Sequence, residues 1–190
     1  AGEVVEGPFL SAKQTVRDYR MEERIEVRLG DGLQILSKED EITAVTICGM
    51  GGELISRILE AGFSGGHLNG KERLILQPNV AEHFVREWLM NHSYRITHET
   101  VVEDNHRLYE IIVAEPVEER VEYTELELKY GPILLQHPSE LSVAKWTRMN
   151  RKNKEIMEQL QKSKTPQHEK IEQFEKAFNE LKGVIDRANS

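Results

Sequence analysis

The sequence predicts an α/β protein with a parallel sheet, closed by an antiparallel strand pair and followed by an antiparallel helical hairpin. Two strand–turn–helix units predict the sheet, because the apolar strands expected over 42–48 and 73–77 each lead through a turn into a helix. Parallel strands need such helical crossovers. Two heptad-patterned segments after Pro138 predict the helical hairpin. We therefore expect two domains, one over 1–116 and one over 117–190.

Further elements are expected before these units. The pattern predicts a strand that ends within 1–5, a helix from Pro8 and a half-buried strand over 25–29. The apolar stripe of this helix consists of Phe9, Ala12, Val16 and Tyr19. A short helix is expected over 33–37. Gly62 is expected to end the longer helix that follows the strand over 42–48.

The second half of the chain changes from strands to long helices. The strands expected over 94–101 and 108–114 are joined by too few residues for a crossover helix, so we expect them to pair antiparallel. A helix is expected over 139–162, and Thr165 and Pro166 are expected to begin the next one. The heptad positions are Trp146, Met149, Asn153, Ile156 and Leu160, then Ile171, Phe174, Phe178, Leu181 and Ile185. These helices could pair within the chain or form a coiled-coil dimer whose register Asn153 sets.

The composition is typical of a soluble protein without a metal centre. No apolar run approaches the ~20 residues that span a bilayer, and no signal-peptide pattern is present. The single cysteine, Cys48, is expected to be a buried structural thiol. The seven histidines show no metal-ligand spacing, and there is no nucleophile elbow. We therefore expect a cytoplasmic protein without a metal ion.

Charge is unevenly distributed along the chain. A net charge of -8 argues against a protein that coats nucleic acid indiscriminately. However, one run of ten residues contains no acid and five basic side chains: Lys145, Arg148, Arg151, Lys152 and Lys154. Such a run is either a solvated helix face or a surface that binds phosphates, and we favour phosphate binding.

The first strand–turn–helix unit contains the glycine turn Gly49-Met-Gly-Gly. Glycines allow a sharp turn and a close approach of the backbone to a ligand. The dinucleotide fingerprint G-x-G-x-x-G is absent because position 54 is leucine, and Glu53 would repel a phosphate at the helix N-terminus. We therefore expect a zwitterionic or uncharged ligand, although the glycines could serve the turn alone.

Polar side chains follow the other strands at the same edge of the sheet, where open α/β sheets bind ligands. The two amides of Gln77-Pro-Asn79 could pair with the edge of a nucleobase, or Asn79 could only cap the next helix. Glu3 and Asp31 each follow a predicted strand, and there a carboxylate can bind ribose hydroxyls or an adenine amino group.

Four segments in order resemble one known family. They are A-G-E-V-V-x-G-P at the N-terminus, G-D-G-L from Gly30, I-C-G-M-G-G from Ile47 and L-I-L-Q-P-N from Leu74, and they are similar to the bacterial tRNA (adenine-22-N1)-methyltransferases. The resemblance covers essentially the whole chain. It implies the Rossmann-like fold of class I S-adenosylmethionine-dependent methyltransferases, a C-terminal coiled-coil-like domain, and methyl transfer to N1 of an adenine.

The resemblance also implies a cofactor, a substrate and their residues. S-adenosyl-L-methionine would be the cofactor and tRNA the substrate. The cofactor would contact three strand ends, through Glu3 and the adjacent Val4 at the ribose, Asp31, Gly32 and Leu33 around the adenine, and Gly49, Met50 and Gly51 at the methionine end. Gln77 and Asn79 would be the catalytic residues, and Pro78 would contact the target base. The basic run would bind the tRNA backbone, and the helical domain could form a homo-oligomer.

The family also has an N-terminal strand and an acidic glycine loop that bind the methionine part of the cofactor. This sequence starts where the second strand of that fold should end, so we expect a truncated or cleaved polypeptide that binds cofactor poorly unless another copy or segment fills the gap. Two other functions stay open: a non-catalytic RNA-binding or assembly module on a degenerate scaffold, and a methyltransferase of another substrate.

Overall fold

The structure is a computed structural model that describes residues 1–162 and 167–189. It divides into two compact units. The first unit contains residues 1–97 and 112–122, and the second contains residues 98–111 and the chain from 123 onward. The second unit therefore includes the tip of a β-hairpin as well as the C-terminal helices. The predicted domain boundary after Pro116 stays a prediction.

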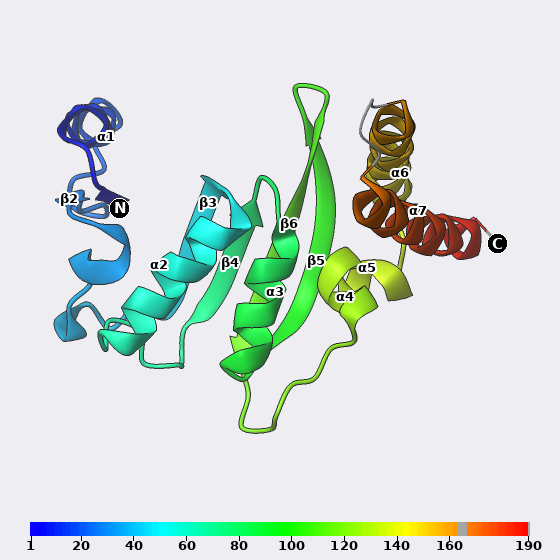
Figure 1. The fold of residues 1–190 in the computed structure, drawn as a ribbon. Coiled ribbons are helices and arrows are strands. Elements are labelled where there is room, and N and C mark those ends of the chain that lie inside the picture. The colour runs from blue at the N-terminus through cyan, green and yellow to red at the C-terminus, as the bar shows by residue number, and fades with distance from the viewer. Residues whose placement is uncertain (163–166, 190) are drawn as a thin grey trace. The chain divides into compact units, whose positions relative to one another are not determined.

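The first unit alternates strands and helices as predicted (Figure 1). Its elements are β1 (Gly2–Glu3), α1 (Glu6–Asp18), β2 (Arg28–Leu29), the 3-10 helices η1 (Gly32–Ile35) and η2 (Lys38–Asp40), β3 (Ala44–Met50), α2 (Gly52–Ser64), β4 (Arg73–Pro78) and α3 (Glu82–Asn91). The strand predicted over 25–29 is shorter than expected, because only its last two residues pair with β1. The apolar stripe of α1 contains no fully buried residue.

These strands fall into two sheets. The first consists of β1 and β2, which are parallel, and the second has the order β3-β4-β6-β5. β5 (Tyr94–Asp104) and β6 (Arg107–Pro116) run through both units. β3 and β4 are parallel, whereas β6 pairs antiparallel with β4. The turn between β5 and β6 has left-handed φ values at Asn105 (47°) and His106 (61°), as in a type I′ hairpin.

One face of the four-stranded sheet is covered by α2 and α3 (Figure 1). On β3, Val45 and Ile47 are buried, whereas Ala44, Thr46 and Cys48 alternate with them and are exposed. The prediction of a buried Cys48 is therefore wrong, because its side chain lies on the exposed face. Partial desolvation raises the pKa of its thiol, which disfavours a nucleophilic role.

Gly62 does not end α2, contrary to the prediction, because the helix continues to Ser64 and Gly65 is its C-cap. Gly62 is instead buried where α2 packs against η1. A Cβ at this position would lie 2.5 Å from Leu33 Cδ1 and 3.0 Å from Leu33 Cβ. The glycine is therefore needed for close packing inside the helix and has a φ that other residues adopt.

A polar and aromatic cluster joins α2 to α3. Trp88 Nε1 donates a hydrogen bond to Glu60 at 2.9 Å, and the His92 ring stacks on Trp88 with centroids 4.1 Å apart. His92 Nε2 lies 3.0 Å from the same carboxylate, and Ser64 Oγ donates to it at 2.7 Å. The hydrogen bonds from Ser64 and Trp88 lower the pKa of Glu60 below its ordinary value of 4.5.

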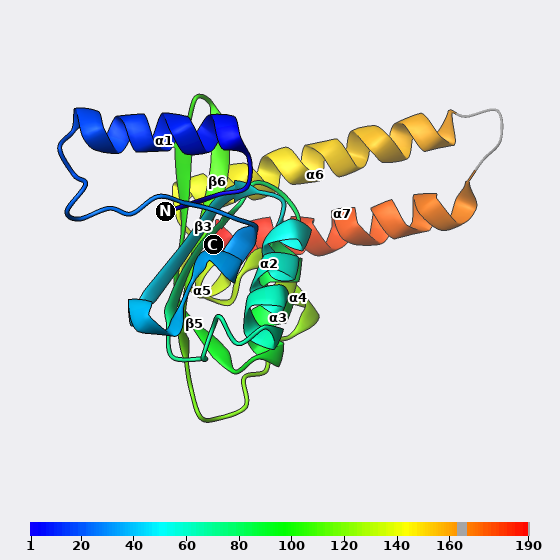
Figure 2. The same cartoon turned by 90° about the vertical axis from the view of Figure 1, so that its left-hand side faces the viewer.

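The second unit packs helices against the hairpin tip. Its helices are α4 (Glu125–Tyr130), α5 (Pro132–Gln136), α6 (Glu140–Gln161) and α7 (His168–Ala188). α6 and α7 form the predicted antiparallel pair (Figure 2). The buried core of this unit consists of Val101, Tyr130, Leu134, Trp146, Leu181 and Val184. Glu99 of β5 accepts a hydrogen bond from the Ile133 amide at the start of α5, at 2.9 Å.

The expected cap Thr165 and the adjacent Pro166 lie outside the described residues. Asn153 is half-buried, whereas Asn150, one helical turn earlier, is buried in α6. Among the described residues, no helix is long and apolar enough to cross a membrane.

The packing at Gly62 generates a stability prediction. We expect Gly62→Ala to lower the free energy of unfolding by about 1–3 kcal/mol, because Leu33 must move to admit the methyl group. Urea denaturation would measure the change. Gly7→Ala in α1 is the control, since a Cβ there meets no atom within 4 Å. An unchanged Gly62→Ala protein would contradict this account of the glycine.

The cluster around Glu60 predicts a pH dependence. Because the pKa of Glu60 is lower in the folded state, its stabilising contribution is complete above about pH 4.5 and is lost as the pH falls through the folded-state pKa. Glu60→Gln should therefore lower Tm most at neutral pH and least under acid conditions. Glu87→Gln, on the exposed side of α3, is the control. A Tm difference that stays constant with pH would count against the prediction.

Candidate functional site

The glycine turn after β3 brings the backbone of two strand–helix connections together. Gly49 has φ +80°, and the register of β3 on β4 shifts there, from Cys48 opposite Gln77 to Met50 opposite Pro78. The Gly52 amide donates to the Val80 carbonyl at 2.8 Å, and a Cβ on Gly52 would lie 2.1 Å from the Ala81 oxygen. Gly52 therefore has to be glycine for α2 to begin against the turn after β4.

The two amides after β4 bind the backbone of Gly49 from both sides. Gln77 Oε1 accepts from the Gly49 amide at 2.8 Å, and Asn79 Nδ2 donates to the Gly49 carbonyl at 2.7 Å. Gln77 Nε2 also donates to Asn79 Oδ1 at 3.1 Å. Each side-chain amide still has one N–H and one oxygen lone pair for a ligand. The alternative that Asn79 caps α3 is wrong, because the N-cap of α3 is Ala81.

The space above this turn is open. An added Cβ at Gly49 would meet no atom within 4 Å, and Met50 and Asn79 are exposed. The N-terminus of α2 that follows contains Glu53 in its first turn. The turn therefore offers an accessible backbone surface at the carboxyl end of β3, and a carboxylate nearby that disfavours an anionic group.

The two acidic candidates lie at one end of the small parallel sheet. Glu3 is the last residue of β1 and pairs in register with Leu29 of β2, and Asp31 follows two residues later. The Gly30 amide donates to the Glu3 carbonyl at 2.9 Å. Glu3 is half-buried, whereas Val4 and Asp31 are exposed.

A cavity of about 200 Å³ lies between this turn and α2. It is lined by Asp31, Gly32, Leu33, Gln34, Leu54, Arg57, Ile58, Ala61 and Gly62. Complete sites for small molecules usually enclose about 300–1,000 Å³, so this cavity fits one part of a larger ligand. It brings together the three residues predicted around an adenine, whereas Glu3, Val4 and the glycine turn do not line it.

Sequence reasoning missed the lining residues on α2. Leu54, Arg57, Ile58 and Ala61 lie on one helix face, which their spacing of three, four and seven residues could have indicated. Arg57 is exposed at this face, so the cavity is lined by charged groups of both signs. Among the described residues, no group of His, Cys, Asp or Glu side chains could hold a metal ion.

The basic run lies on α6 and has acidic neighbours in three dimensions. Lys145 pairs with Glu110 at 2.8 Å, and the two side chains are only 12% and 3% exposed. Arg148 donates to the His106 carbonyl at 3.1 Å and lies 3.7 Å from Glu103. The more distal members of the run form exposed pairs one turn apart, Arg151 with Glu155 and Lys154 with Glu158.

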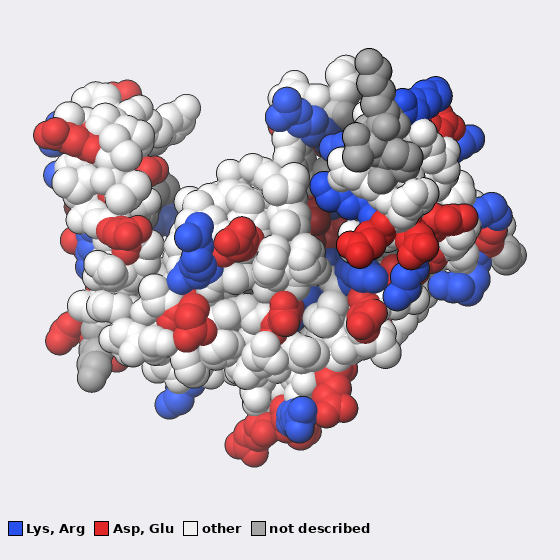
Figure 3. All heavy atoms as spheres, in the orientation of Figure 1, with Lys and Arg blue, Asp and Glu red and all other residues white. Residues whose placement is uncertain are grey.

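This pairing changes the interpretation of the run. On the face of the second unit seen in Figure 3, basic and acidic side chains lie next to one another. Lys145 belongs to the packing between α6 and the hairpin, so it cannot reach a ligand without breaking a buried pair. Arg148, Arg151, Lys152 and Lys154 are exposed.

Comparison with known proteins identifies the family. The family described as TrmK: tRNA (adenine(22)-N(1))-methyltransferase matches residues 1–183. This chain belongs to the TrmK family. A tRNA (adenine(22)-N(1))-methyltransferase of Bacillus subtilis (strain 168) is 40% identical over 192 residues, which cover 98% of this chain and 79% of the relative.

Solved structures of similar proteins have the same fold. An uncharacterised protein from Listeria monocytogenes aligns with a TM-score of 0.91 at 37% identity, covering 97% of this chain and 81% of the other. A Streptococcus pneumoniae protein, described as a candidate tRNA (m1A22) methyltransferase in complex with S-adenosyl-L-methionine, aligns with a TM-score of 0.85 at 36% identity, covering 97% and 79%. A 32% identical structure from Streptococcus agalactiae is assigned to the NADB-Rossmann superfamily. The predicted Rossmann-like methyltransferase fold is therefore confirmed.

Proposed function

We propose that this chain transfers a methyl group from S-adenosyl-L-methionine to N1 of adenine 22 in tRNA. The observation that carries the proposal is the family match over residues 1–183, which includes both the cavity beside Asp31 and the turn at Gly49. Because tRNA is the substrate, we also propose a cytoplasmic location. Homo-oligomerisation through the helical domain stays a prediction.

The residues present fit parts of S-adenosyl-L-methionine in chemistry. The cofactor is zwitterionic at its amino-acid end, in line with an open glycine turn that has no phosphate-binding fingerprint. We assign its adenine to the cavity lined by Asp31, Gly32 and Leu33, and its ribose hydroxyls to Glu3 with Val4 beside it. Gly49, Met50 and Gly51 would face the methionine end. When bound, the cofactor supplies an electrophilic methyl group on a sulfonium.

The chain itself has to position the base and exclude water. Adenine N1 has an in-plane lone pair, so no strong general base is needed, and orientation of the base is the main task. The remaining N–H and oxygen sites of Gln77 and Asn79 are available to hold the base edge. Their oxygens also stabilise the positive charge that methylation creates on the ring. Pro78 is buried between them and fixes the backbone on which both amides stand.

The exposed basic residues of α6 would bind the tRNA backbone. Arg148, Arg151, Lys152 and Lys154 extend over two helical turns of an exposed face. Their exposed ion pairs contribute little stability, so phosphates can replace the carboxylates at low cost. Lys145 is excluded from this surface by its buried pair with Glu110.

A methylation assay tests the proposed function. The full-length protein, incubated with labelled S-adenosyl-L-methionine, should methylate a tRNA transcript with adenine at position 22 and leave the guanine-22 transcript unlabelled. Mapping by primer extension should stop at that nucleotide, since N1 methylation blocks base pairing. If the protein binds tRNA but transfers no methyl group, the non-catalytic RNA-binding alternative would replace this proposal.

The hydrogen bonds of Gln77 and Asn79 to the Gly49 backbone predict the effect of removing one side-chain amide. Asn79→Ala should lower kcat at least tenfold, because it removes a base-orienting group and the hydrogen bond to the Gly49 carbonyl. The dissociation constant for S-adenosyl-L-methionine should stay within about twofold, because Gln77 still accepts a hydrogen bond from the Gly49 amide. Asn91→Ala at the end of α3 is the matched control. Unchanged turnover would remove Asn79 from the catalytic residues.

The basic surface predicts a change in salt dependence. Replacing Arg148, Arg151, Lys152 and Lys154 by glutamine should weaken tRNA binding and reduce the slope of log affinity against log salt by about 0.7–0.9 per lost contact. The matched control replaces four basic residues of α7: Lys170, Lys176, Lys182 and Arg187. If both quadruple variants behave alike, α6 is not a specific tRNA-binding surface.

A further inference from the structure

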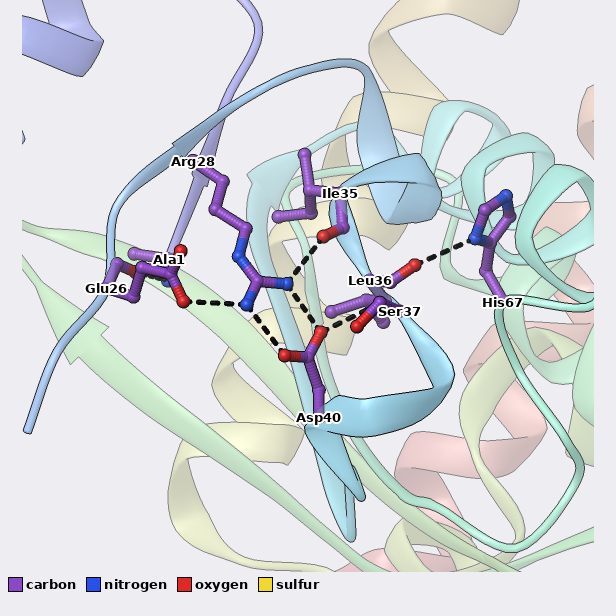
Figure 4. A network of polar contacts seen from close by, with 8 residues as sticks. All are labelled: Ala1, Glu26, Arg28, Ile35, Leu36, Ser37, Asp40 and His67. Carbon is purple, nitrogen blue, oxygen red and sulfur yellow. Dashed lines mark hydrogen bonds and ion pairs between the residues drawn. The ribbon is translucent and has the colours of Figure 1, made fainter.

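A bidentate ion pair closes the loop that contains the Asp31 turn (Figure 4). Arg28 Nη2 lies 2.6 Å from Asp40 Oδ1, and Arg28 Nη1 lies 2.5 Å from Asp40 Oδ2. The two residues are twelve positions apart, and the turn Asp31-Gly32-Leu33 lies between them in sequence. The side chains are 30% and 17% exposed, so the pair is partly withdrawn from water.

The same guanidinium also binds other parts of the loop. Arg28 Nη1 donates to the Ile35 carbonyl at 2.8 Å, and Nη2 donates to Glu26 at 2.6 Å. Asp40 in turn accepts from the Ser37 amide at 2.8 Å. One arginine therefore connects both ends of the loop and its middle, as Figure 4 shows.

A second set of contacts holds the outer side of the loop against α2. His67 Nδ1 lies 3.0 Å from the Leu36 carbonyl, and Leu33 packs against Gly62. Gly32 has φ +52°, and its added Cβ would lie 3.1 Å from Ile58. The turn is therefore held by Arg28 and Asp40 on one side and by α2 on the other.

Regular secondary structure contributes little to holding this loop. η1 and η2 are single turns of four and three residues, and Asp31 makes no side-chain cap for η1. Short 3-10 segments have poor hydrogen-bond geometry and few bonds of their own. The conformation of the turn thus depends on side-chain contacts, among them those of Arg28 to Ile35 and Asp40.

We propose that Arg28 and Asp40 are positioning residues, which hold the Asp31-Gly32-Leu33 turn in the conformation that binds the nucleoside part of the cofactor. This inference rests on the proposed function. Neither residue lines the cavity, so they act through the turn and do not touch the ligand. The pair holds the loop closed in place of the backbone hydrogen bonds that a longer helix or strand would form.

The chemistry of the pair explains why arginine is needed. The guanidinium fork matches both carboxylate oxygens and still reaches the Ile35 carbonyl, which a lysine ammonium cannot do from one position. Hydrogen bonds from Arg28 and from the Ser37 amide hold the pKa of Asp40 well below its usual range. The carboxylate therefore stays charged, and the pair stays formed, over the pH range in which tRNA is stable.

Titration calorimetry with the full-length protein tests this inference. We expect Arg28→Lys and Asp40→Asn each to raise the dissociation constant for S-adenosylhomocysteine about tenfold, the loss expected when one hydrogen bond between charged groups is removed. The double variant should lose no more cofactor affinity than the more strongly affected single variant, because both substitutions remove the same interaction. KM for S-adenosyl-L-methionine should rise in parallel, while kcat at saturating cofactor and the dissociation constant for tRNA stay within about twofold.

Controls separate positioning from a general loss of structure. Arg73→Lys removes the fork from an exposed pair with Glu115 in the same unit and should leave cofactor affinity unchanged. Unchanged cofactor affinity in Arg28→Lys and Asp40→Asn would overturn the inference, as would an equal loss of cofactor and tRNA affinity. If the wild-type protein binds no cofactor and methylates no tRNA, the proposed function itself fails. That outcome is therefore distinct from failure of the inference alone.

Discussion

The close packing of both ends of α2 is the constraint on which the site depends. At its start, Gly52 lies against the turn after β4, where a Cβ would be 2.1 Å from the Ala81 oxygen. Near its end, Gly62 lies against Leu33, where a Cβ would be 2.5 Å away. One helix therefore fixes the distance between the turn after β4 and the turn after β2. Because a helix of this length is stiff, the two halves of the site keep their spacing without a continuous sheet between them.

The polar residues of the candidate site form hydrogen bonds to the backbone in addition to offering groups to a ligand. Gln77 and Asn79 bind both polar groups of Gly49, and Arg28 binds the Ile35 carbonyl as well as Asp40. A glycine turn is conformationally free, and a single-turn 3-10 helix has few hydrogen bonds of its own, so side chains have to fix both. A catalytic site needs such fixed geometry because a small displacement of the base or cofactor slows the reaction.

Elements with strong periodicity could be predicted from the sequence, and residues that depend on tertiary packing could not. The strand predicted over 73–77 is Arg73–Pro78, and the helix predicted over 139–162 is Glu140–Gln161. The prediction that Gly62 ends α2 was wrong, because a glycine that ends a helix and a glycine that allows close packing inside one look alike in sequence. α4 went unpredicted, although Thr124 and Glu127 form a capping box that signals its start. The residues of α2 that line the cavity were missed because one helix face can serve either the core or a ligand.

The basic run shows how position in three dimensions decides the role of a charge. Lys145 and Glu110 are both nearly buried, so separating them would break a close ion pair where water can hardly replace either charge, and this pair is structural. Arg151 and Lys154 instead pair with carboxylates on an exposed helix face, where water screens the attraction. An RNA phosphate can replace those carboxylates, and the released counterions favour the exchange. The five residues that look equivalent in sequence therefore divide into one lysine that stabilises the second unit and four exposed side chains that the proposed function assigns to tRNA.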